Sequence, residues 1–218
     1  MTLLNWLETI VMGGILGTAL LFRPWLPLRH GPLQSPWLAA LAILPLAWWT
    51  QHLLPSGFGL HLSGACLAVL MFGWPLAMWT MALVALVADT VAIGSLPAWT
   101  SWVSHTVWMG LLPGTLGLGL GLMIRRWLPH HLFVYILGRG FISTALAVSL
   151  MGVLAWWLGR QPDTLSTEEW LLGHWLLGWG EAISTGMLTS IFVAFKPEWL
   201  LTYSDARYLP PPERPSPH

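Results

Sequence analysis

Long apolar runs restrict this chain to one environment, the lipid bilayer. A helix that crosses the hydrocarbon core needs about 20 mostly apolar residues. Only 8% of the 218 residues are charged, whereas soluble domains contain about 25%. We expect an all-α, polytopic membrane bundle of about seven transmembrane helices, at residues 3–22, 37–54, 60–74, 75–94, 101–124, 131–158 and 170–196.

The boundaries of the domain follow from the same runs. The run at 60–74 is short and only Trp74-Pro75 separates it from the next, so a broken or partly re-entrant helix is the alternative to a full span here. Glu8 and the lack of a basic segment before the first run predict no signal-peptide cleavage. We expect one integral membrane domain over 1–200 and an extended, Pro-rich cytoplasmic tail over 201–218.

Basic residues predict the orientation. Cytoplasmic loops of membrane proteins are enriched in Lys and Arg. With the N-terminus outside and the C-terminus in the cytoplasm, Arg160 is alone in the outer loops. The cytoplasmic segments then hold Arg23, Arg29, Arg125, Arg126, Lys196, Arg207 and Arg214. Most of the 17 Trp fall at the ends of the runs, as interfacial belts do.

The charge balance and the single cysteine exclude several classes. Nine basic residues balance nine acidic ones, so no basic surface is expected to hold nucleic acid. Cys66 is alone, which excludes an internal disulfide and any CxxC metal or redox motif. The expected surroundings are therefore the bilayer and other membrane proteins.

Eight ionisable residues interrupt the apolar runs, and each is a functional hypothesis because a charge in the membrane is costly. The orientation above places six of them in the outer third of the bundle: Glu8, His52, His61, Asp89, His105 and His174. Imidazoles and carboxylates are ligands that Co²⁺, Ni²⁺, Cu²⁺ and Zn²⁺ accept. We therefore expect an outer-face metal site built from these six. For His52 and His174 a structural, hydrogen-bonded role is the alternative, and helically spaced methionines more often pack than ligate.

The remaining two, Arg139 and Glu181, lie nearer the middle of the membrane. Their simplest expected role is to neutralise each other as a buried ion pair. Glu181 shares one stripe of its predicted helix with His174, Gly178 and Thr185. Gly178 should allow a neighbouring helix to approach closely.

Two glycine-rich segments predict close packing. Gly13, Gly14 and Gly17 form a small-residue face that suits either a partner subunit or internal packing. The stretch GTLGLGLGLM at 114–123, directly after Pro113, indicates a kinked or closely packed helix. No strand precedes it and no Lys-Ser/Thr follows it, so it is not a nucleotide-binding loop.

Two segments resemble a known transporter family. PSGFGLHLSGACLAVLMFGWPL at 55–76 resembles a segment of the cobalt/nickel uptake permeases, the substrate-specific membrane components of energy-coupling factor transporters. GEAISTGMLTSIFVAFKPEWL at 180–200 is similar to that family's last helix. The resemblance implies about seven spans with the N-terminus outside, His61 as a metal ligand, and cobalt or nickel as substrate. It also implies a multi-pass protein of the bacterial plasma membrane.

The resemblance carries expectations about energy supply and cofactors. This sequence has no Walker motif, so a separate transmembrane coupling protein and ATPases would drive transport. No tightly bound cofactor is expected, because the divalent metal is the substrate. The family typically begins Met-His-Ile-Pro, which completes a flat, nitrogen-rich site. Here the sequence begins Met1-Thr2-Leu3-Leu4, so His52, His105 and His174 are the expected substitute ligands, and Cu or Zn stays open beside Co and Ni.

Two functions of other classes stay open. Facing imidazoles in the outer layer would suit a haem-carrying electron-transfer or assembly protein that acts without ATPases. An intramembrane metallohydrolase would use His and a carboxylate with metal-bound water, but the sequence lacks an HExxH motif. We expect a transport component and not an enzyme.

Overall fold

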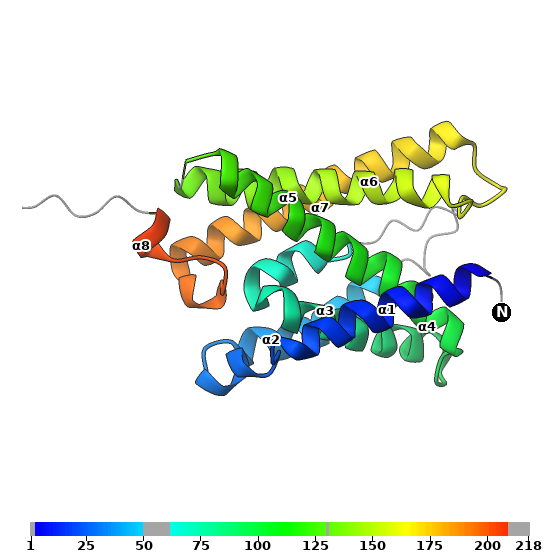
Figure 1. Ribbon diagram of the computed structural model, residues 1–218, viewed down its shortest axis with the longest axis horizontal. Helices are drawn as coiled ribbons and strands as arrows, with labels where there is room; N and C mark the ends of the chain where they lie inside the picture. Colours follow the sequence, from blue (N-terminus) through cyan, green and yellow to red (C-terminus); the bar gives the residue numbers. More distant parts are fainter. Residues whose placement is uncertain (1–2, 50–61, 130, 209–218) are drawn as a thin grey trace, which may run out of the picture.

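The computed structural model describes residues 3–49, 62–129 and 131–208, which form a bundle of helices (Figure 1). The α-helices are α1 (Leu3–Leu21), α2 (Gln34–Trp49), α3 (Ala65–Ile93), α4 (Trp99–His105), α5 (Leu112–Trp127), α6 (Ser143–Trp157), α7 (Thr167–Phe195) and α8 (Asp205–Tyr208). Two π-helical segments, η3 (Thr106–Leu111) and η4 (Val134–Ile142), join α4 to α5 and lead into α6. Short 3₁₀ turns are η1 (Leu26–His30) and η5 (Pro197–Trp199). The described residues contain no strand, which confirms the all-α class.

Five helical stretches are long and apolar enough to cross a membrane: Leu3–Leu21, Ala65–Ile93, Trp99–Trp127, Val134–Trp157 and Thr167–Phe195. Within the described residues α2 has 16 residues and is about 24 Å long, against a hydrocarbon core of roughly 30 Å. The predicted runs 60–74 and 75–94 merge into α3. The expected count of seven spans is therefore not confirmed within the described residues, and the orientation stays a prediction.

α3 is broken at Gly73, where φ is 73° and ψ is 159°. A Cβ placed at Gly114 would lie 3.6 Å from the Cβ of Ala65 and 2.8 Å from the Cε of Met78. A straight helix would separate those two residues by about 20 Å, so the chain reverses at the break. The half-helix 65–72 therefore folds back toward the second arm of α3, which confirms the broken helix predicted at Trp74-Pro75.

The C-terminal segment satisfies the carbonyl groups that this break leaves open. Pro75 has no N–H to donate to the carbonyl of Met71, four residues earlier. The N–H of Leu201 donates to that oxygen instead (2.9 Å), and the N–H and hydroxyl of Thr202 donate to the oxygen of Leu70 (3.3 and 2.9 Å). The segment after α7 therefore acts as a C-terminal cap for the half-helix.

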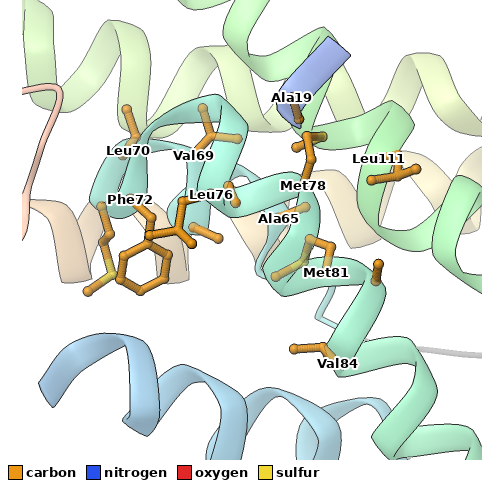
Figure 2. Close-up of a cluster of buried hydrophobic side chains, with 14 of the residues drawn as sticks. Ala19, Ala65, Val69, Leu70, Phe72, Leu76, Met78, Met81, Val84 and Leu111 are labelled. Carbon is orange, nitrogen blue, oxygen red and sulfur yellow. The ribbon is translucent and has the colours of Figure 1, made fainter. Parts of the chain in front are cut away.

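The hydrophobic core surrounds the break. α3 contacts α1, α2, α5 and α7, while α6 and α7 form the most extensive helix pair. Figure 2 shows the buried side chains on both arms of α3 converging with those of its neighbours. They include Ala65, Val69, Leu70, Phe72, Leu76, Met78, Met81, Val84, Ala19 and Leu111.

The glycines divide into two groups. A Cβ at Gly117 would lie 2.7 Å from the sulfur of Cys66, and one at Gly178 would lie 2.8 Å from the carbonyl oxygen of Ala145. The close packing predicted for the glycine-rich stretch and for Gly178 is therefore confirmed. Around Gly13, Gly14 and Gly17 no described atom lies within 4 Å of such a Cβ. Internal packing of that face is not seen in the described residues, and docking of a partner there stays a prediction.

Candidate functional site

A cavity of about 210 Å³ penetrates the end of the bundle at which α1 begins and α6 passes to α7 (Figure 1). The α6–α7 pair forms one wall and η3 with the start of α5 forms the other. Trp170 lies in the first turn of α7, whereas Glu181 is about 21 Å along the helix. The lining residues are Ser63, Trp108, Met109, Pro113, Val148, Met151, Ala155, Arg160, Trp170, His174, Leu177 and Glu181.

Glu181 closes the deep end of the cavity and is only 1% exposed. Its Oε2 accepts the N–H of Ser63 and its Oε1 accepts the N–H of Gly64, both at 3.0 Å. These N–H groups lie at the start of the half-helix 65–72, whose N-terminus carries partial positive charge. A carboxylate from α7 thus caps a helix that starts inside the bundle, and the two hydrogen bonds make burial of its charge tolerable.

Neighbouring helices fix the backbone at Ser63. Its hydroxyl donates to the carbonyl oxygen of Met109 (2.6 Å), and its own carbonyl accepts the indole N–H of Trp48 (3.0 Å). Met109 lies in η3, and π-helical turns often occur at functional sites. The deep end of the cavity is therefore held from α2, η3 and α7 together.

The prediction of an ion pair between Arg139 and Glu181 is wrong. The Nη1 of Arg139 donates to the hydroxyl of Tyr208 (3.4 Å) instead. The reason is depth: Gly140, beside Arg139, packs against Thr189, which is about 12 Å along α7 from Glu181. Arg139 therefore hydrogen-bonds Tyr208, and Glu181 hydrogen-bonds Ser63 and Gly64, at different depths of the bundle.

Glu8 participates in a cluster at the mouth of the cavity. Its Oε1 accepts the indole N–H of Trp108 (2.7 Å) and pairs with Nη1 of Arg160. The guanidinium of Arg160 also donates to the hydroxyl of Ser104 (2.6 Å) and lies over the Trp108 ring at 4.9 Å. Arg160, from the α6–α7 loop, therefore ties that loop to α1 and η3 across the mouth.

Asp89 and His105 form a separate pair. The Oδ1 of Asp89 lies 2.7 Å from the Nδ1 of His105, whereas its Oδ2 is buried with no hydrogen-bond partner. Neither residue lines the cavity. This geometry orients the imidazole as carboxylates do beside metal sites, but the pair supplies only two ligand groups.

His174 lies on the wall of the cavity. Its Nδ1 is 3.0 Å from the carbonyl oxygen of Trp170, one turn earlier, and its ring is 4.2 Å from that indole. Gly152 of α6 provides the space, because a Cβ there would lie 2.3 Å from the Cβ of His174. The structural hydrogen bond expected as the alternative for His174 is present, and the ring also lines the cavity.

The structure brings together part of the predicted ligand set. His174 and Glu181 share the cavity and Glu8 lies at its mouth, but His52 and His61 fall outside the described residues. Within the described part of the chain, no three His, Cys, Asp or Glu side chains could hold one metal ion. Of the described histidines only His174 lines the cavity, so the described residues provide no pair of axial haem ligands there.

The sequence did not predict the residues that hold Glu8 and Glu181 in place by hydrogen bonds or ion pairs. The sequence identifies Arg160 only as the one basic residue of the predicted outer loops. A single arginine in otherwise uncharged or acidic outer loops can indicate a specific partner, which here is Glu8. Trp108 lies in mid-helix, away from the expected belts. Ser63 contributes backbone atoms, which side-chain patterns do not reveal.

Comparison with known families identifies the chain. Residues 6–199 match the model of the cobalt uptake substrate-specific transmembrane region. The chain belongs to this family. It is a multi-pass membrane component of cobalt uptake, and the resemblance inferred from the segments at 55–76 and 180–200 is confirmed. No curated protein and no solved structure matches the chain significantly.

The cavity combines a buried carboxylate with an imidazole and soft sulfur groups. It extends from one end of the bundle to a carboxylate about 21 Å inside α7. Its lining contains an imidazole and thioether sulfurs, from His174, Met109 and Met151. These are groups that borderline divalent metals accept.

Proposed function

We propose that this protein captures Co²⁺ or Ni²⁺ at the outer face of the bacterial plasma membrane through the cavity above Glu181. The orientation with the N-terminus outside places the mouth, at Glu8 and Arg160, on that face. The observation that carries the proposal is a cavity lined by the buried carboxylate of Glu181 and the imidazole of His174, in a bundle whose core is otherwise mostly apolar.

The electrostatics of the cavity favour a cation at its deep end. Glu181 supplies the negative charge there, and no basic side chain lines that end among the described residues. Arg160 at the mouth is neutralised by Glu8. A divalent ion that enters therefore moves from a neutralised mouth toward a carboxylate.

His61 is the proposed principal ligand. It precedes Ser63 by two residues in the sequence, and Ser63 contributes the N–H that Glu181 accepts. His174 on the cavity wall is the proposed second imidazole, with His52 as a further candidate. Asp89, His105 and Glu8 lie off the cavity lining, and we assign them to capture of the ion before it enters.

Movement of the ion through the membrane needs an energy source outside this chain. The sequence has no nucleotide-binding motif. We propose that a transmembrane coupling protein and ATPases of the energy-coupling factor type reorient the bundle and release the ion inward.

Binding of Co²⁺ and Ni²⁺ to the purified full chain tests the proposal. H61A should weaken binding by more than about 100-fold, because even partners of metal ligands contribute 10–100-fold. H174A should weaken it by a smaller factor. H131A is the matched control, because His131 is exposed in the connection between α5 and η4.

The proposal fails if H61A binds cobalt as tightly as the wild type while H131A is also unchanged. Thermal unfolding of each variant separates loss of a ligand from loss of the fold. Cobalt binding that survives in both H61A and H174A would place the site away from this cavity.

A further inference from the structure

Arg139 is a buried cation that has no counter-ion among the described residues. The side chain is 6% exposed, and no carboxylate among the described residues lies within ion-pair distance. Its Nη1 donates to the Tyr208 hydroxyl, its guanidinium lies 5.5 Å from the centre of the Tyr135 ring, and its Nε has no hydrogen-bond partner. A buried charge without a partner is strongly unfavourable, so the arrangement calls for an anion.

A second arginine faces the same small cavity. The cavity has a volume of about 10 Å³ and lies among Arg125, Leu128, Tyr135, Arg139 and Tyr208. Arg125 is half-buried and has no ion pair among the described residues. The adjacent Arg126 is exposed and does not line the cavity.

Both arginines lie at the level where the chain leaves the apolar region. Arg125 is two residues from the end of α5, and Arg139 is about 7.5 Å into the stretch that begins at Val134. α8 lies at the same end of the bundle, away from the N-terminus (Figure 1). Lipid phosphates occupy this level of a bilayer.

We propose that Arg125 and Arg139 bind a phosphate group, supplied by the phosphodiester headgroup of an anionic lipid. Guanidinium groups form strong, geometrically matched hydrogen bonds to phosphate oxygens. A volume of about 10 Å³ takes about one oxygen atom, so the phosphate inserts one oxygen between the arginines. The rest of the headgroup stays at the membrane surface, where the acyl chains hold it.

The site is independent of the cobalt path. It lies at the opposite end of the bundle from the cavity mouth (Figure 1). Failure of the metal proposal would leave this inference intact, and the reverse also holds.

Native mass spectrometry of the full chain in a neutral detergent tests the site. The probes are phosphatidylglycerol, a diacylglycerol with the same acyl chains, and inorganic phosphate. We expect one saturable phosphatidylglycerol per chain and no comparable binding of the diacylglycerol. R125Q should weaken phosphatidylglycerol binding by more than about tenfold, because a charge-assisted hydrogen bond is lost.

Matched variants separate a built site from general surface charge. R126Q should change binding by less than about fivefold, as expected for one surface charge near an anionic lipid. R139K keeps the positive charge but loses the planar guanidinium that can donate two parallel hydrogen bonds. The variant should stay folded and bind phosphatidylglycerol more weakly than the wild type. If inorganic phosphate displaces the lipid at an Arg125-dependent site, the phosphate chemistry is upheld and free phosphate becomes a second source.

Three results would overturn the inference. Equal binding of diacylglycerol and phosphatidylglycerol would show that the acyl chains alone are recognised. Equal losses in R125Q and R126Q would show only surface electrostatics. Glu213 is the one acidic residue of the C-terminal tail after α8, and tighter phosphatidylglycerol binding in E213Q than in the wild type would show that this carboxylate is the natural occupant.

Discussion

Replacing Gly152 by alanine tests the contact that positions His174. The new Cβ would lie 2.3 Å from the Cβ, 2.4 Å from the Cγ and 2.9 Å from the Cδ2 of His174. Carbon atoms in ordinary contact are about 3.5–4.0 Å apart. The Cβ of His174 is fixed to the backbone of α7 and cannot rotate away, so α6 and α7 must separate by about 1 Å.

The size of the effect follows from two opposing contributions. Overpacking of this kind lowers the free energy of unfolding by about 1–3 kcal/mol. Replacing Gly by Ala within a helix raises it by about 0.8–1.0 kcal/mol. G152A should therefore lower the free energy of unfolding by about 1 kcal/mol, or the Tm by about 2–4 °C. In G180A, where no described atom lies within 4 Å of the new Cβ, the helix gain alone remains and the Tm should rise.

Thermal unfolding in detergent, followed by circular dichroism, measures both variants under the same conditions. H174G removes the opposing Cβ, so G152A should be less damaging in the H174G background, with a coupling energy of about 0.5–3 kcal/mol. Cobalt binding should weaken in G152A and stay unchanged in G180A. A G152A protein as stable as the wild type, or strict additivity with H174G, would refute the reasoning.

Three further changes have defined outcomes. E181Q leaves one N–H at the start of the half-helix 65–72 without an acceptor and should reduce the free energy of unfolding by about 2 kcal/mol. The Tm should fall and cobalt binding should weaken, whereas an unchanged Tm would contradict the capping role. R160Q removes the positive charge at the cavity mouth and frees the carboxylate of Glu8, so the initial rate of radioactive cobalt binding should rise, whereas R160K should match the wild type. H105A leaves the carboxylate of Asp89 buried and unpaired, at a cost of about 2 kcal/mol, and D89N should relieve most of that loss in a double-mutant cycle; equal losses in both backgrounds would contradict the pairing.

The predictions that succeeded rest on short-range chemistry. The apolar runs predict helices because any other backbone would leave polar groups unsatisfied in lipid. Gly178 and the stretch 114–123 were recognised as close-packing segments because only glycine permits such an approach. Trp74-Pro75 signalled the break because proline cannot donate within a helix.

The predictions that failed or stayed open depend on relative depth. Arg139 and Glu181 have complementary charges and similar positions along their runs, yet the register of η4 against α7 separates them. Sequence spacing fixes position along one helix, whereas the sliding of two helices past each other depends on many packing contacts together. The same limit applies to the outer ligands, of which the structure joins Asp89 to His105 but leaves the pair off the cavity.

By itself the sequence determined the lipid environment, the all-helical class and the family, because hydropathy and local motifs are properties of single segments. Only the tertiary structure decided which partner each buried charge finds. Glu181 is capped by backbone N–H groups from a half-helix that starts inside the bundle. Arg139 lies at the far end without a carboxylate among the described residues. In a medium of low dielectric, a charge is tolerated only where its partners are within hydrogen-bond reach, and that reach is set by how the helices pack.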